Sequence, residues 1–443
     1  MAGGSVLRRG GYRDLVIGQA VSSFGDWMGT VALMALVLDL TGSATAVGVI
    51  LVLRLLPAGF AGPIAAGVAE RWDRRRIMLT CDLARAGLVA LIPLVRAAWW
   101  VYLWAFLLEV ANLVFLPARD ASIPDLVDED ELPTANGIIL GSSYGNIPLG
   151  AGAFALLSLV PTSWNGYLDT HSGALPLWLD GATYLVSYAF ISRLRVLGPS
   201  RAPAAGGRDG ARRGLWAGIA AAVRLPIVRA VLPATITAVI GVGALFSLGM
   251  VFVREVLHAS TAQFGVMVAL FGVGGVGGWA WLQRRQDAPT LATIRLAAAA
   301  MGVILAIMSL LSTVELAYLA AVPFGAAGAS ALVASITYLQ ETLSGEDRLL
   351  GLTVYHVVFR VGLSVAAIGG GLAAQAFGPA RLPVLGTLQP SALVLLCAGA
   401  VMVLGAALMP TSVAAPAPAV AGRRPEVEAQ ARRRDRDGRE AAR

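Results

Sequence analysis

Residues 67–76 read Gly-Val-Ala-Glu-Arg-Trp-Asp-Arg-Arg-Arg; they close one long apolar stretch, 44–69, and lead into the next, 77–96. A helix needs about 20 mostly apolar residues to cross a bilayer. Guanidinium groups, in contrast, are costly in lipid and stay in water. Long apolar stretches separated by short charged loops therefore predict a protein that crosses the membrane several times.

The composition of the whole chain supports this prediction. Of its 443 residues, 57% are hydrophobic and 14% are charged, against about 25% charged in soluble domains. A soluble enzyme is excluded. The net charge of +7 does not indicate nucleic-acid binding, because the Arg residues lie between apolar segments. Two Cys and three His predict neither a disulfide scaffold nor a metal cluster, and no phosphate-binding loop or cofactor motif stands out.

Apolar stretches predict twelve transmembrane helices, so the expected fold class is an all-α membrane protein. The predicted spans are residues 14–38, 44–69, 77–96, 100–119, 135–160, 174–194, 229–253, 262–283, 291–312, 315–340, 350–376 and 384–409. An Arg-, Gly- and Pro-rich linker, 196–228, separates two six-helix halves, 1–195 and 229–410. Residues 411–443 are expected to form a disordered tail. Two equal halves are typical of transporters built from repeats.

The Arg residues indicate the topology. They concentrate before span one and after spans two, six and eight, and the exceptions in the other loops are Arg96, Arg254 and Arg381. Cytoplasmic loops carry the excess of positive charge. Both termini and the linker are therefore predicted to be cytoplasmic.

The loop at 67–76 resembles the Gly-x-x-x-Asp-Arg-x-Gly-Arg-Arg signature of the major facilitator superfamily, found between helices two and three. Glu70 stands where Asp is usual, Asp73 where Gly is usual, and the leading glycine is displaced to Gly67. This variant resembles the branch of the enterobactin exporter and the macrolide efflux proteins. Further stretches similar to that branch are residues 22–27, 40–43, 115–119, 123–127 and 135–136.

The resemblance implies a twelve-helix fold, secondary active export and a bacterial inner membrane. It also implies a cytoplasmic gate, formed by Glu70, Arg71, Asp73, Arg74, Arg75 and Arg76. Asp82 and Arg85, three residues apart in span three, are expected to join that network. The alternative is that the Arg cluster only orients the protein. Two departures from proton antiporters are the missing Arg in span four and a degraded Gly-Pro motif, 145–150.

Four charged residues lie near the middle of predicted spans: Asp26, Arg54, Glu109 and Arg360. Charges at this depth are rare and are functional candidates by default. Gln19, Ser22 and Asp26 share one helical face, which we expect to line a water-accessible cavity. Two interpretations of Asp26 are open. It exchanges protons with water, or it forms a permanent ion pair with Arg54 that fixes helix packing.

Two further spans carry polar side chains at helical spacing. Glu109 and Asn112 are candidates for proton transfer or for binding a cationic substrate, and packing onto a polar neighbour is the alternative. In span eleven, His356 and Arg360 share a face; His356 titrates near neutral pH when free, and a simple hydrogen bond is the favoured interpretation. In span five, Gly137, Gly141, Gly145 and Pro148 predict close helix packing.

The predicted function is proton-coupled export of small amphipathic or hydrophobic compounds, such as a drug, siderophore or secondary metabolite, by alternating access. The expected partners are this substrate, protons and the lipid bilayer, with no nucleic acid, and the expected state is a monomer. One alternative is a lysophospholipid or metabolite transporter without proton antiport. The other is a membrane receptor or assembly partner that does not transport.

Overall fold

The computed structural model describes residues 6–55, 72–128, 131–160, 174–195, 220, 223–285, 289–382 and 386–412. Long helices dominate both halves. The first half contains α2 (Gly10–Thr41), α3 (Ala44–Leu55), α5 (Arg74–Leu91), α6 (Ala98–Asp120), α7 (Leu132–Tyr144), α8 (Ile147–Leu157) and α9 (Ala174–Ile191), with short 3-10 helices η1 (Ile92–Leu94) and η2 (Ile123–Asp125). The second half contains α11 (Pro226–Glu255), α12 (Thr261–Arg284), α13 (Leu291–Ser309), α14 (Val314–Thr342), α15 (Gly345–Ala376) and α16 (Pro390–Ala407).

These helices account for the twelve predicted spans. Within the described residues, ten helices are long and apolar enough to cross a membrane. Of the two remaining spans, α3 supplies the described part of one and α7 with α8 the other. The span predicted over 135–160 consists of two helices, with an interruption after Tyr144. Pro148 has no N–H for the carbonyl of Tyr144, and in an uninterrupted helix its ring would clash with that carbonyl.

Two predicted boundaries also need correction. The last span begins at Pro390 and not at residue 384, because β1 (Ala380–Leu382) and β2 (Gly386–Leu388) pair as antiparallel strands. Proline is well suited to the first turn of a helix, where its missing N–H has no partner. Helix α11 begins at Pro226, so the predicted linker is three residues too long at its end. Apart from residues 411 and 412, the predicted tail lies outside the described residues.

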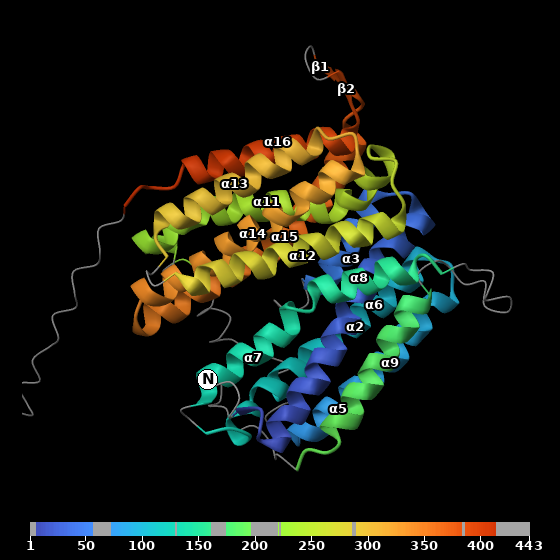
Figure 1. The fold of residues 1–443 in the computed structure, drawn as a ribbon, viewed down its shortest axis with the longest axis vertical. Coiled ribbons are helices and arrows are strands. Elements are labelled where there is room, and N and C mark those ends of the chain that lie inside the picture. Colours follow the sequence, from blue (N-terminus) through green and yellow to red (C-terminus); the bar gives the residue numbers. More distant parts are fainter. Residues whose placement is uncertain are drawn as a thin grey trace, which may run out of the picture. The chain divides into compact units, whose positions relative to one another are not determined.

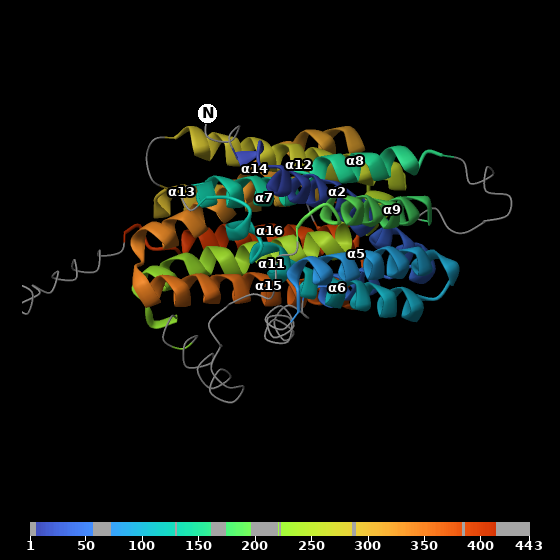
Figure 2. The ribbon, with the colours of Figure 1, turned by 90° about the horizontal axis from the view of Figure 1, so that it is seen from below.

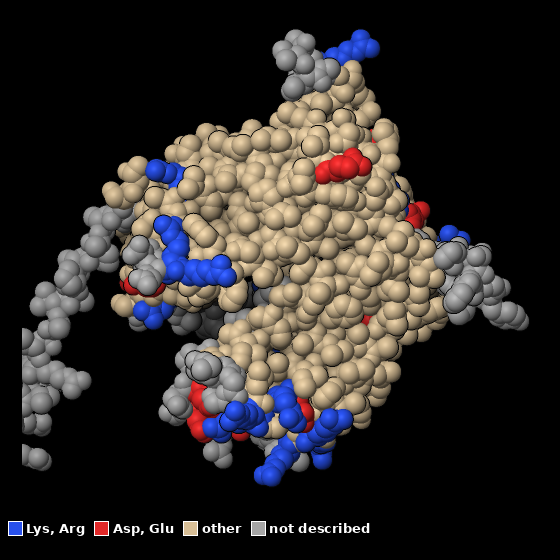
Figure 3. All heavy atoms as spheres, in the orientation of Figure 1, with Lys and Arg blue, Asp and Glu red and all other residues tan. Residues whose placement is uncertain are grey.

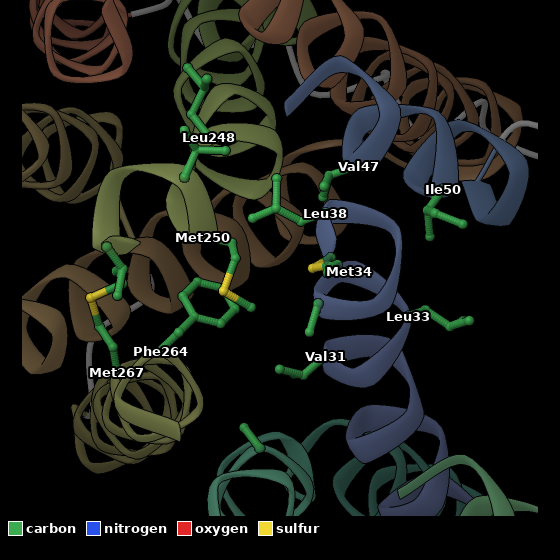
Figure 4. Close-up of a cluster of buried hydrophobic side chains, with 14 of the residues drawn as sticks. Val31, Leu33, Met34, Leu38, Val47, Ile50, Leu248, Met250, Phe264 and Met267 are labelled. Atoms are coloured by element: carbon green, nitrogen blue, oxygen red, sulfur yellow. The ribbon is translucent and has the colours of Figure 1, made fainter. Parts of the chain in front are cut away.

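The two halves meet along the last turns of α2 and α11. Every residue from Met28 to Leu38 is buried in α2, and so is every residue from Ser247 to Val253 in α11. A helix that is apolar and buried on all sides is surrounded by other helices. Figure 4 shows side chains of α2, α3, α11 and α12 turned toward one another there, with Phe264 and Met34 in one cluster. We call the end at which α2, α11 and α15 finish the closed end.

Three further pairs of helices join the halves: α3 with α15, α3 with α11, and α8 with α12. A Cβ at Gly48 would lie 2.7 Å from the carbonyl oxygen of Ala367, and one at Gly272 would lie 2.8 Å from the ring of Pro148. Small residues therefore let these helices approach closely. In the first half, α2 lies beside α9 in both views of the ribbon (Figures 1 and 2).

The surface is apolar where a bilayer would contact it. Leu296 and Leu319 are each 72% exposed, and Leu156 is 70% exposed. Charged side chains gather near the edges of the face shown in Figure 3 and leave a broad uncharged area between them. Such a large exposed apolar surface marks a membrane-contacting region.

Candidate functional site

Asp26 and Arg54, predicted from separate spans, lie together in the structure. The nearest pair of their charged atoms, Asp26 Oδ1 and Arg54 Nη2, is 4.0 Å apart. Helix α2 carries Asp26 and α3 carries Arg54, and the turn at 42–43 that joins them brings the helices side by side. The Asp26 side chain is 24% exposed and that of Arg54 is 16% exposed. The ion pair is therefore neither tightly closed nor sealed from solvent.

Hydrogen bonds on both sides hold this pair in place. The hydroxyl of Tyr184, on α9, donates to Asp26 Oδ1 at 2.5 Å. Arg54 donates to the hydroxyl of Thr30, and that hydroxyl donates to the backbone carbonyl of Asp26 at 2.6 Å. Thr30 lies one turn after Asp26 on α2, so one helix positions both partners of Arg54. Tyr184 was not predicted; a tyrosine within an apolar span carries no distinctive signal.

Arg85 lies next to this group, beside Tyr184, and its side chain is buried. Its guanidinium pairs with the carboxylate of Asp82, one turn earlier on α5, and the two side chains are 2% and 0% exposed. The guanidinium also stacks on the rings of Phe115 and Tyr184, with centroid distances of 4.2 and 4.4 Å. Cation–π contacts of this kind gain strength when water is excluded. The described contacts thus join Asp82 and Arg85 to Tyr184, on the Asp26 side, and not to the loop at 72–76.

Glu109 and Asn112 lie on the same side of α6. Glu109 is 8% exposed, and Arg54, Asp26 and Arg360 are the charged groups whose fields act on it. Arg85 Nη1 lies 3.4 Å from the side-chain oxygen of Asn112. The two residues therefore border the group formed by Asp26, Arg54 and Tyr184.

The two candidate residues of span eleven make only local hydrogen bonds among the described contacts. His356 is exposed, and its Nδ1 lies 2.8 Å from the carbonyl of Leu352, one turn earlier. Arg360 is exposed as well, and its backbone carbonyl accepts a hydrogen bond from Ser364 at 3.0 Å. This hydrogen bond agrees with the interpretation of His356 favoured from the sequence.

Gln19 and Ser22 share the face of Asp26 but contact other residues. Gln19 accepts a hydrogen bond from Arg119 at 2.9 Å and donates one to Ser23 at 2.6 Å. Ser22 is 1% exposed and bonds to the backbone carbonyl of Gln19. The buried Arg119 was not singled out in the sequence, although it is an Arg at the end of an apolar span. This end of the polar stripe fastens α2 to α6.

The described part of the loop signature ties α5 to the rest of the first half. Asp73 caps the helix by accepting a hydrogen bond from the backbone N–H of Arg76 at 2.9 Å. Arg74 pairs with Asp125 in η2, and Arg75 donates to the carbonyl of Ser192 at the end of α9. Glu70 and Arg71 lie outside the described residues. These contacts of Arg74 and Arg75 lie within the first half, and gating by this loop stays a prediction.

Among the described residues, nothing packs closely on Gly137, Gly141 and Gly145 from another helix. A Cβ at Gly137 or Gly141 would meet no atom within 4 Å, and one at Gly145 would meet only its own helix. The interruption after Tyr144 is held to α2 instead, where Asn146 donates to the carbonyl of Ala20 at 2.7 Å. Close approach occurs further along, at Gly150 and at Pro148.

A cavity of about 530 Å³ lies at the closed end and not at the Asp26 group. It is lined by both halves, with Ser43 from the first and His258 and Gln375 from the second. Ser43 and Gln375 are joined by a hydrogen bond of 2.9 Å. The candidate site is therefore the group formed by Asp26, Arg54 and Tyr184. It is identified by the charges and hydrogen bonds described above, and this cavity lies elsewhere.

Residues 15–341 match the family model described as the Major Facilitator Superfamily. The chain belongs to the major facilitator superfamily. The protein is therefore a transporter and not an enzyme, and it crosses the membrane several times, as its many apolar helices require. Members of this superfamily bind small-molecule substrates within the membrane.

Several relatives share parts of this transporter's sequence. Macrolide efflux protein A of Streptococcus pyogenes is 29% identical over 27% of the chain, and the MFS-type transporter YfiS of Bacillus subtilis is 28% identical over 28% of it. These matches span 31% and 30% of the relatives' own lengths. The MFS-type transporter YvqJ of Bacillus subtilis is 24% identical over 77% of the chain and 81% of its own length.

Solved structures share its fold. A bacterial homolog of the human lysosomal transporter Spinster superimposes with a TM-score of 0.69 at 15% identity, covering 89% of this chain and 94% of that one. The nucleoside transporter NupG superimposes with a TM-score of 0.68 at 12% identity, covering 89% and 97%. At these identities the likeness establishes the major facilitator fold of this transporter.

Proposed function

We propose that this transporter exports small amphipathic or hydrophobic compounds in exchange for protons, and that Asp26 is the carboxylate that exchanges protons with water. The observation that carries the proposal is the arrangement of Asp26, Arg54 and Tyr184. A partly exposed carboxylate lies 4.0 Å from a guanidinium and accepts a hydrogen bond at 2.5 Å from a tyrosine. Deep ionisable pairs of this kind mark proton pathways in membrane proteins.

Protonation of Asp26 would change the contacts between α2 and α3. The ionised carboxylate attracts Arg54, whereas the neutral acid does not. Helix α3 packs on α15 and the last turns of α2 lie against α11, so both helices also contact the second half. A change at Asp26 therefore acts on the contacts that must open when the halves rock.

The proposed substrate class rests on the relatives and on the apolar surroundings of the site. Macrolide efflux protein A is named for the efflux of macrolides. Near Asp26, the rings of Phe115 and Tyr184 stack on Arg85, and the helices around them are otherwise largely apolar. Apolar walls with a few placed polar groups suit compounds that partition between water and lipid.

The proposed setting is the bacterial inner membrane, with both termini in the cytoplasm and the protein acting as a monomer. The support is the excess of Arg in alternate loops. In this topology the closed end faces away from the cytoplasm. The conformation described here then has its outer side shut, as an exporter requires when it takes up cargo from the cell.

Transport in proteoliposomes tests the proposal. Purified transporter is reconstituted with and without a pH gradient, and uptake of radiolabelled erythromycin and of ethidium is measured. We expect accumulation only with the gradient. Asp26→Asn should abolish that accumulation and keep exchange of the compound at equal pH. The control is Glu315→Gln, which replaces an exposed carboxylate at the start of α14 and should behave as the wild type.

Two outcomes would contradict the proposal. If Asp26→Asn accumulates the compounds as the wild type does, Asp26 has no coupling role. If the wild type moves erythromycin or a lysophospholipid equally well without a pH gradient, the protein is a transporter that does not use proton antiport.

A further inference from the structure

In the part of the first half around Asp26, carboxyl groups outnumber guanidinium groups. Within the described residues they are the carboxyls of Asp26, Asp82, Glu109 and Asp180 and the guanidiniums of Arg54 and Arg85. Arg85 pairs with Asp82 and Arg54 faces Asp26. Two carboxyl groups are left without a cation of their own.

Asp180 is the more deeply buried of these two. It lies on α9, in predicted span six, and is 2% exposed. Its Oδ1 is buried and has no hydrogen-bond partner among the described residues. The carboxyl group lies against α2 at Gly25 and Gly29, where any Cβ would overlap one of its oxygens. Two glycines one turn apart thus leave room for this side chain and offer it no donor.

The charged groups whose fields reach Asp180 lie on three helices. Helix α2 contributes Asp26, α3 contributes Arg54 and α5 contributes Arg85. On α9 itself, Thr183 and Tyr184 are the polar neighbours. The other elements in contact with α9, η1 and α8, carry no titratable side chain. Asp180 therefore shares Arg54 with Asp26 and shares Arg85 with Asp82.

Asp180 has no cation of its own, and its Oδ1 has no hydrogen-bond partner among the described residues. An ionised carboxylate in that position is very costly to bury, and its neutral form is much less so. Asp26, in contrast, has both a donor, Tyr184, and a cation, Arg54. We propose that in this conformation Asp180 holds the coupling proton while Asp26 is ionised, and that Asp26 is the intermediate between Asp180 and water. This inference rests on the proposed proton coupling and names where the proton resides.

The transfer is balanced in atoms and charge. The O–H bond of the Asp180 carboxyl breaks and the proton bonds to a carboxylate oxygen of Asp26, directly or through one water molecule. Negative charge moves from Asp26 to Asp180, and Arg54 then attracts the new carboxylate. Asp26 afterwards releases the proton to water on the side to which it is open. Asp180 thereby decides which carboxylate binds Arg54, which links protonation to the α2–α3 contact.

Infrared spectroscopy tests this assignment without a substrate. A protonated carboxylic acid has a carbonyl band distinct from that of carboxylates, and the band shifts when H2O is replaced by D2O. We expect the wild type, solubilised in detergent near neutral pH, to show such a band. In Asp180→Asn, the intensity of the band should fall by the amount that one carboxyl group contributes. The control Glu315→Gln should keep it. An unchanged band in Asp180→Asn would overturn the assignment.

Transport separates this inference from the proposed function. Asp180→Asn should lose erythromycin accumulation driven by the pH gradient and keep exchange at equal pH. Asp180→Ser serves as the second variant if the Asn variant does not fold. Full gradient-driven accumulation in either variant contradicts the inference and leaves the proposed function standing. Absence of gradient-driven accumulation in the wild type contradicts the proposed function itself.

Discussion

At the scale of single residues, polar side chains inside the apolar helices of the first half form ion pairs and hydrogen bonds with one another. Tyr184 is the residue that connects them, because its hydroxyl binds Asp26 and its ring stacks under Arg85. Breaking a buried pair leaves an uncompensated charge and costs more than the pair contributes. Substitutions in this group should therefore affect both folding and transport.

Removing the hydroxyl of Tyr184 tests this connection. Tyr184→Phe keeps the ring under Arg85 but deletes the donor to Asp26. A hydrogen bond to a charged group contributes about 1.5–3 kcal/mol, so the free energy of unfolding in detergent should fall by about that amount. Tyr188→Phe, one turn later on α9 and 38% exposed, is the matched control. Equal stability of the two variants would contradict the role given to the Tyr184 hydroxyl.

At the scale of elements, the two helices of span five differ in how closely they pack. Gly150 of α8 lies against α2, whereas a Cβ at Gly137 or Gly141 of α7 would meet no described atom within 4 Å.

Alanine substitutions along this span should therefore have opposite effects. At Gly150, a Cβ would lie 2.7 Å from the carbonyl of Phe24 and 2.9 Å from the backbone nitrogen of Met28. Gly150→Ala should destabilise the protein by about 1–3 kcal/mol through overpacking.

Gly137→Ala, which meets no atom, should be neutral or stabilise by up to about 1 kcal/mol through helix propensity. Thermal unfolding in detergent measures both. A loss of stability for Gly137→Ala that matches that of Gly150→Ala would show that α7 is closely packed.

At the scale of the whole transporter, polar contacts join the two halves at the closed end. Arg254 of α11 pairs with Asp39 of α2 at 2.6 Å and also donates to Thr261 at 2.6 Å. Gln375 of α15 donates to Ser43. Because the two charged side chains are 31% and 35% exposed, water weakens their attraction. Such a bond can hold one conformation without preventing the other.

Loss of this ion pair should make the closed end open more often. An exposed pair contributes about 0.2–1 kcal/mol, so Asp39→Asn should raise the open population by up to about fivefold. Met34→Cys, at a position 3% exposed, reports opening through its rate of reaction with a water-soluble maleimide, with Cys81 and Cys397 replaced by Ala.

The same label in a Glu315→Gln background serves as the control. An unchanged labelling rate in Asp39→Asn would show that this ion pair does not hold the closed end.

Much of the fold was already predictable from the chain. Twelve apolar stretches and the loop signature at 67–76 predicted the helices and the family, because lipid requires long apolar helices and the signature is specific to this superfamily. Asp26 and Arg54 were predictable as a pair, since charges inside a span need a partner. Asp180 carried the same signal within span six and was overlooked beside the four charges nearer the middle.

Hydropathy is a property of each stretch of sequence taken alone. The sequence by itself therefore determined which segments enter the membrane and which charged residues those segments contain. Only the tertiary structure decided which of those charges meet. The helices that bring Tyr184 and Asp180 to Asp26 are about 150 residues apart in sequence, and their contact depends on glycines in α2 that leave room for a carboxyl on α9. Such placement arises from packing in three dimensions, which no periodicity within a single helix encodes.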